Sequence, residues 1–129
     1  MKRKIECENV IKPIGPYNIA IQYNNLIFIS GQIPVDKNGN IISESIEKET
    51  EQVLKNIEEI LKSIGLSKDN ILKTTIFLRN ISDFQKVNEI YAKFFEGTIF
   101  PARTTVEVSN LPKNVNIEIE AICFSDNIS

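Results

Sequence analysis

A single arginine stands in an alternating segment near the C-terminal end of the chain, in the run FPARTTVEV at 100–108. Successive side chains of an extended strand point to opposite faces, so Arg103 and Thr105 are predicted to share one face. The planar guanidinium has paired N–H donors that match a carboxylate, which makes Arg103 a candidate clamp for a small 2-oxo or 2-imino acid. The alternative is a cross-strand ion pair with Glu118 or Glu120.

Two further segments contain polar groups that suit the same kind of pocket. In IGPY, Gly15 and Pro16 form a rigid turn that presents Tyr17. In ISGQIP, Ser30 ends an apolar strand, and Gly31 allows a ligand to approach the main chain closely. Each segment also fits an ordinary role, since Tyr17 suits the edge of a sheet and Ser30 a plain strand end.

The residues that are missing restrict the chemistry. The chain contains no histidine, which is the commonest general base and the commonest transition-metal ligand. A serine nucleophile therefore has no histidine to activate it, and the five glycines form neither a phosphate-binding loop nor a dinucleotide fingerprint. We expect either chemistry without a metal or organic cofactor, or binding alone.

Composition indicates one folded domain over residues 1–129. Of these residues 42% are hydrophobic and 25% are charged, and the net charge of −2 comes without a basic cluster, which argues against nucleic acid as a partner. No apolar run approaches the roughly 20 residues of a membrane span, and the first residues lack a secretory signal. Cys7 and Cys123 show no metal-binding spacing, so we expect free thiols and a cytoplasmic protein.

Hydrophobic periodicity predicts two helices among several strands. Residues 46–65 carry apolar residues at helical spacing, and a second helix is predicted to open at SDFQ, with Ser82 and Gln85 as a capping box. The predicted strands are 19–23, 26–31, 71–78, 103–108 and 117–124, with a hairpin turn at 24–25. This order of elements predicts an α+β sandwich, a mixed sheet with both helices on one face.

The last predicted strand indicates what covers the other face. Along 117–124, one face is wholly apolar, whereas the opposite face mixes Glu118 and Glu120 with Ile122 and Phe124. A purely solvated face would not need Ile122 and Phe124, so this face is expected to lie in a subunit interface or a cleft. Self-association is therefore predicted.

The segments IGPY, FISGQIPVD, KTTIFLRNISDF, VNEIYAKFF, FPARTTVEV and LPKNVNIEIEA together resemble the RidA family, also called YjgF, in the order in which that family has them. The resemblance implies a fold similar to the trimeric chorismate mutases and a homotrimer with three clefts between subunits. It also implies the activity of a 2-iminobutanoate/2-iminopropanoate deaminase, which hydrolyses reactive enamines and imines such as 2-aminoacrylate to 2-keto acids and ammonia. No metal or organic cofactor is implied.

The resemblance also assigns roles to individual positions. The family's carboxylate-binding arginine corresponds to Arg103, and its water-associated glutamate corresponds to Glu118. Tyr17 and Ser30 match positions that line the family's cleft, and Gly31 matches a backbone contact.

Two positions need separate comment. Thr105, which we count with Tyr17, Ser30, Gly31 and Arg103 among the substrate-binding residues, stands where several members have cysteine. A thiol role is lost there, although hydrolysis is expected to persist because it needs a clamped carboxylate and an oriented water. Asn88 matches a recurrent motif, but we assign it a capping or bridging role on its helix.

The expected mechanism follows from these roles. Arg103 grips the substrate carboxylate, and Glu118 positions water toward the imine carbon and shuttles protons to the departing nitrogen. The alternative function is a module that binds a keto acid without catalysis. Ribonuclease activity, which has been attached to relatives of the family, ranks last because the chain has a pI of about 5.3 and no histidine.

Overall fold

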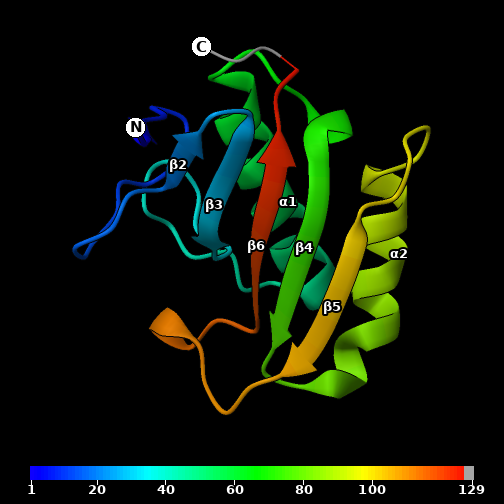
Figure 1. The fold of residues 1–129 in the computed structure, drawn as a ribbon. Coiled ribbons are helices and arrows are strands. Elements are labelled where there is room, and N and C mark those ends of the chain that lie inside the picture. The colour runs from blue at the N-terminus through cyan, green and yellow to red at the C-terminus, as the bar shows by residue number, and fades with distance from the viewer. Residues whose placement is uncertain (127–129) are drawn as a thin grey trace.

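A six-stranded sheet with two α-helices on one of its faces forms the fold in a computed structural model, which describes residues 1–126 (Figure 1). The helices are α1, Ile46–Lys62, and α2, Phe84–Phe94. The predicted fold class, an α+β arrangement with both helices on one face of a mixed sheet, is confirmed.

The strands are β1 Arg3–Ile5, β2 Ala20–Tyr23, β3 Leu26–Gln32, β4 Ile71–Leu78, β5 Ala102–Glu107 and β6 Ile117–Phe124. Their order in the sheet is β1-β2-β3-β6-β4-β5. Neighbouring strands are antiparallel except β4 and β5, which are parallel and are joined through α2. Strand β1 has only three residues, which are too few for alternation to define its bounds from the sequence. The order makes β5 an edge strand beside α2 (Figure 1).

The sheet has one buried face and one open face. In β6, the side chains of Ile117, Ile119, Ala121 and Cys123 are buried with the apolar sides of the helices in one core. We call this the helix face. Phe28, Val106 and Ile122 belong to the opposite parity and are 44%, 39% and 37% exposed. We call this second side the open face, and its partly apolar surface agrees with the mixed face predicted for 117–124.

The observed helix caps agree only in part with those predicted from the sequence. Helix α1 starts after Ser45, whose side chain accepts a hydrogen bond from the backbone N–H of Lys48 at 3.1 Å. The capping box predicted at Ser82 and Gln85 is wrong. Ser82 instead lies in a 3₁₀ turn, where its N–H donates to Asn80 Oδ1 at 3.0 Å, and α2 begins after that turn without a side-chain cap.

Both cysteines are free, as the sequence predicted. Burial raises the pKa of the Cys123 thiol to about 12, which makes it unreactive in the folded chain. Cys7 is half-buried, and its thiol donates weakly to the Glu59 carbonyl at 3.5 Å. None of the helices in residues 1–126 combines the length and apolar character needed to cross a membrane.

Candidate functional site

Arg103 lies on the helix face of the edge strand β5. It is in register with Thr74 of β4, whose side chain is fully buried under the helices, so the two side chains point the same way. The guanidinium carbon lies 5.0 Å from the ring centroid of Tyr91 and 5.4 Å from that of Phe84, both on α2. These distances are typical of cation–π contacts, which hold the guanidinium beside the helix.

The ion-pair alternative for Arg103 is wrong within one chain. Strand β4 separates β5 from β6, and on β4 the partner of Glu118 is Phe77 whereas that of Arg103 is Thr74. These positions have opposite parity, so Glu118 points to the open face and Arg103 to the helix face. The ion pairs within residues 1–126 involve other side chains, and Arg103 has no carboxylate partner among them.

A cavity of about 300 Å³ adjoins the guanidinium, and we call it the arginine cavity. It is lined by Asn88, Tyr91, Ala92, Phe100, Pro101 and Arg103. Desolvation raises the pKa of the Tyr91 hydroxyl, although the hydrogen bond of 2.7 Å with Thr74 and the positive charge of Arg103 act in the opposite direction. Tyr91 therefore stays neutral near pH 7 and provides a fixed platform for the guanidinium.

Two buried polar atoms beside Arg103 lack hydrogen-bond partners among the described residues. One is Asn88 Oδ1, in the wall of the arginine cavity, and the other is the Thr105 hydroxyl, two residues along the same face of β5. Buried polar groups are normally satisfied, so such atoms mark places where a ligand or water belongs. Asn88 was assigned a capping or bridging role from the sequence. Its spacing of four from Phe84 and three from Tyr91 was the signal that it shares their helix face.

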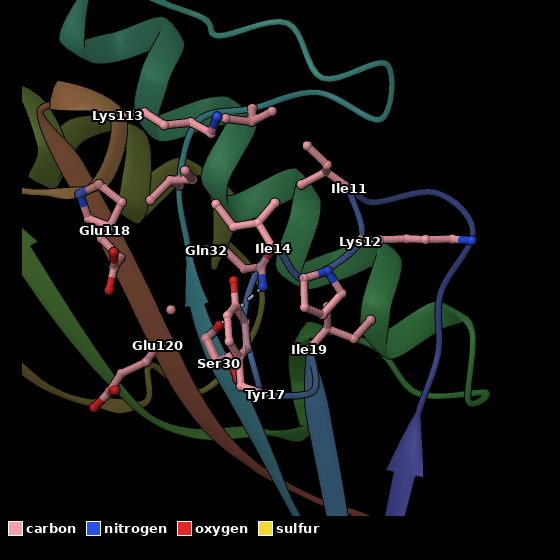
Figure 2. Close-up of a pocket in the computed structure, with 15 residues that line it drawn as sticks. Ile11, Lys12, Ile14, Tyr17, Ile19, Ser30, Gln32, Lys113, Glu118 and Glu120 are labelled. Atoms are coloured by element: carbon pink, nitrogen blue, oxygen red, sulfur yellow. Dashed lines mark hydrogen bonds between the residues drawn. The ribbon is translucent and has the colours of Figure 1, made fainter.

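A second and larger cavity, of about 450 Å³, is separate from the arginine cavity and brings four of the predicted residues together (Figure 2). Tyr17, Ser30, Gly31 and Glu118 all line it, and we call it the glutamate cavity. The Ser30 hydroxyl donates to the Asn18 carbonyl at 2.6 Å, which fixes that side chain in the wall. The register of β3 against β6 shifts between residues 29 and 32, so the strand bulges at Ser30 and Gly31.

Glu118 is held in close contact with the backbone of Gly31. A β-carbon added at Gly31 would come within 2.7 Å of Glu118 Cδ, so only glycine leaves room for this carboxyl group. Partial burial raises the pKa of Glu118, and the nearby charge of Glu120 raises it further. Both effects favour the protonated form of Glu118, which suits a group that exchanges protons with water.

The predicted site residues thus form two groups on opposite sides of the sheet. Tyr17, Ser30, Gly31 and Glu118 share the glutamate cavity, whereas Arg103 and Thr105 lie on the helix face. A single chain does not bring the arginine and the glutamate into one pocket.

Comparison with known proteins matches residues 7–124 to the family described as Endoribonuclease L-PSP. A Rid family protein from Yersinia pestis has 51% sequence identity, with a TM-score of 0.94 over 97% of this chain and all of that one. This chain belongs to that family, which includes the Rid and YjgF proteins. The predicted resemblance to RidA is confirmed.

Two other members are informative. The Arabidopsis thaliana protein named Reactive Intermediate Deaminase A, chloroplastic, is 48% identical over 94% of this chain and 65% of that protein. The structure of Escherichia coli TdcF with bound serine is 35% identical, with a TM-score of 0.92 over 96% of this chain and 99% of that one.

Proposed function

We propose that this RidA-type protein hydrolyses reactive enamines and imines, namely 2-aminoacrylate and related 2-imino acids such as 2-iminopropanoate and 2-iminobutanoate, to 2-keto acids and ammonia. The observation that carries the proposal is the Arg103 guanidinium, which rests on two aromatic rings and has no carboxylate partner in residues 1–126. A bidentate clamp for a substrate carboxylate needs such a guanidinium. The name of the Arabidopsis relative and the serine bound to TdcF, a small amino acid, support this class of ligand.

The proposed reaction uses both cavities. The substrate carboxylate binds the guanidinium of Arg103, and Glu118 accepts a proton from a water whose oxygen adds to the imine carbon. The proton then passes from Glu118 to the nitrogen, which gives a carbinolamine. Glu118 next takes the hydroxyl proton of the carbinolamine and delivers it to the same nitrogen, so the C–N bond breaks and ammonia leaves as the carbonyl forms. Tyr17 and Ser30 bound the pocket. No metal or organic cofactor takes part in these steps, and we assign the reaction to the cytoplasm.

We propose further that the protein is a homotrimer in which the arginine cavity of one subunit faces the glutamate cavity of the next. Two features support this arrangement. The first is that the arginine cavity contains the carboxylate-binding Arg103 but no glutamate, whereas the glutamate cavity contains Glu118 but no arginine. The second is the open face, where Phe28, Val106 and Ile122 leave an apolar surface that a partner subunit would cover. Light scattering at micromolar concentration tests the assembly, and a monomer would contradict it.

Arg103→Lys tests the clamp. Lysine keeps the positive charge and can still lie over Tyr91, so the melting temperature should change by only a few degrees. It loses the two-pronged donor, and a charged hydrogen bond contributes about 1.5 to 3 kcal/mol, so hydrolysis should fall roughly ten- to a hundredfold. The assay generates 2-aminoacrylate from serine with a dehydratase and follows pyruvate release. Arg3→Lys is the matched control, because Arg3 lies on β1, away from both cavities, and should leave the rate unchanged.

Complementation tests the sharing of a site between subunits. Chains carrying Arg103→Lys and chains carrying Glu118→Gln are each expected to be nearly inactive. When the two are co-expressed and mix at random, roughly a quarter of the clefts receive an intact arginine and an intact glutamate. Activity of about a quarter of the wild-type value is therefore expected, whereas a site built within one subunit would recover none.

The alternative function, binding of a keto acid without catalysis, has its own outcome in these measurements. A binding module would take up pyruvate with an affinity that depends on Arg103, yet it would not accelerate pyruvate release from 2-aminoacrylate. Calorimetric titration with pyruvate beside the rate assay separates the two.

A further inference from the structure

The glutamate cavity has an acidic side and an aliphatic side. Its carboxylates, Glu118 and Glu120, lie on β6 on one side, and Ile14 and Ile19 lie across from them (Figure 2). We call the second side the apolar wall, and its aliphatic members are Ile11, Ile14, Ile19, Ile33 and Val35.

The fold holds part of the apolar wall rigidly. Ile19 and Val35 are buried in the structure. The carbonyls of Ile33 and Val35 both accept hydrogen bonds from the Asn56 side-chain amide on α1, at 3.1 Å and 3.0 Å. The oxygen of that amide accepts in turn from Gln52 at 2.8 Å. Because Asn56 is itself buried and satisfied, the segment at 33–35 is fixed before any ligand arrives.

Ile14 completes the wall from the solvent side. It lines the cavity, yet 73% of its surface is exposed. An aliphatic group placed in the cavity would remove part of this surface from water, which is favourable in proportion to the apolar area covered.

Charge and size narrow the kind of ligand that fits. Glu118 and Glu120 would repel an acidic side chain, but two lysines, Lys12 and Lys113, also line the cavity. The amino group of Lys12 extends away from the other labelled side chains in Figure 2, and Lys113 offsets part of the negative charge, so the aliphatic wall more than the charge selects the side chain. A volume of about 450 Å³ lies within the range of small-molecule sites and is far larger than the methyl group of a three-carbon imino acid needs.

We infer that the apolar wall binds the side chain of the substrate, and that the protein prefers 2-imino acids with a branched aliphatic side chain over the three-carbon compound. The inference rests on the proposed imine hydrolysis and adds its substrate class. It places the protein after reactions that oxidise or transaminate branched aliphatic amino acids through an imine.

The test compares imines made in place by an L-amino acid oxidase from leucine, alanine and glutamate. Semicarbazide traps the imine that escapes hydrolysis, so the enzyme is measured by the loss of semicarbazone formation. One methylene in an apolar pocket commonly changes specificity tenfold or more, so kcat/KM for the leucine-derived imine should exceed that for the alanine-derived imine by at least about tenfold. The glutamate-derived imine should be the poorest of the three, because its side-chain carboxylate would lose water against the aliphatic wall.

A variant of the apolar wall tests whether that wall causes the preference for the leucine-derived imine. Ile14→Asn should lower the ratio of leucine-derived to alanine-derived kcat/KM by about tenfold. The matched control is Ile41→Asn, since Ile41 is also exposed but does not line the cavity, and its ratio should stay at the wild-type value. An unchanged ratio in Ile14→Asn would overturn the assignment of the wall.

The outcomes separate this inference from the proposed function. Hydrolysis of the alanine-derived imine with no preference for the leucine-derived imine overturns the inference and leaves the proposed function intact. Hydrolysis of neither overturns the proposed function. Titration with 4-methyl-2-oxopentanoate and with pyruvate then tests the cavity without catalysis, and equal affinity for the two keto acids refutes the apolar side-chain site.

Discussion

Gly31 provides a direct test of how Glu118 is placed. Its backbone does not occupy the left-handed region, so alanine can adopt the same conformation. The added β-carbon would nevertheless lie 2.7 Å from Glu118 Cδ and 3.0 Å from Cγ, whereas ordinary contacts begin at 3.4 Å. The Glu118 carboxyl group would therefore have to retreat by roughly 0.7 Å at Cδ, the difference between 2.7 and 3.4 Å. Gly31→Ala thus moves the carboxyl group without removing it.

The expected effects on activity and on stability differ. A displacement of about 1 Å in a reacting group can lower a rate about a hundredfold, so imine hydrolysis should fall by one to two orders of magnitude. Stability should change little, because Glu118 is only half-buried and can rotate toward the cavity. Alanine also reduces the entropy of the unfolded chain, which offsets the strain by about 0.4 to 1 kcal/mol.

Gly65→Ala is the matched control and should behave in the opposite way. Gly65 has a φ of 76° and open space around it, so alanine there costs about 1 to 2 kcal/mol of folding free energy through backbone strain, while the glutamate cavity is untouched. Pyruvate release and thermal unfolding are measured on the same preparations. Full hydrolase activity in folded Gly31→Ala would refute the placement of Glu118 as the group that orients water.

Two other predictions concern groups whose surroundings are unusual. Because the pKa of Glu118 is raised in the folded chain, its contribution to stability is present below the unfolded pKa and is lost as pH rises through the folded pKa. Glu118→Gln should thus gain stability relative to the wild type as pH rises above about 4.3, the ordinary pKa of a glutamate. Melting curves of the two proteins that stay parallel as pH rises would contradict the raised pKa. Thr105→Val removes a buried hydroxyl without a partner in residues 1–126, so unfolding free energy should stay equal or rise by up to about 1 kcal/mol. If this hydroxyl contacts substrate as predicted, hydrolysis should fall, and wild-type kcat/KM would remove Thr105 from the binding site.

The strand containing Arg103 shows what alternation can and cannot reveal. The pattern correctly placed Arg103 and Thr105 on one face, because side-chain parity is a local property of an extended chain. It suggested Glu118 and Glu120 as partners, which was wrong. The identity of the neighbouring strand depends on contacts far apart in the sequence, and β4 lies between the two.

Helix α2, which packs beside Arg103, shows the same limit of prediction from a sequence pattern. Phe84 and Tyr91 are seven residues apart, which places them on one face of a helix, and apolar residues at that spacing are ordinarily core residues. Tyr91 is indeed buried, and both rings also lie under the guanidinium, because β5 is an edge strand and its side chains reach the flank of the helix. The spacing therefore identified the face of the helix, and only the packing of α2 against β5 shows what that face contacts.

The position of each half of the site follows from the sheet itself. A sheet closed on one side by helices leaves a polar side chain two ways to reach solvent, through the open face or past an edge. Glu118, on the central strand β6, takes the open face, and Arg103, on the edge strand β5, lies at the flank of α2. Glu118 and Arg103 therefore do not meet within one subunit. A neighbouring subunit that packs against the open face can bring its own arginine to the glutamate of the first. This geometry makes the proposed function depend on assembly, so dilution to a monomer should abolish hydrolysis even where the fold survives.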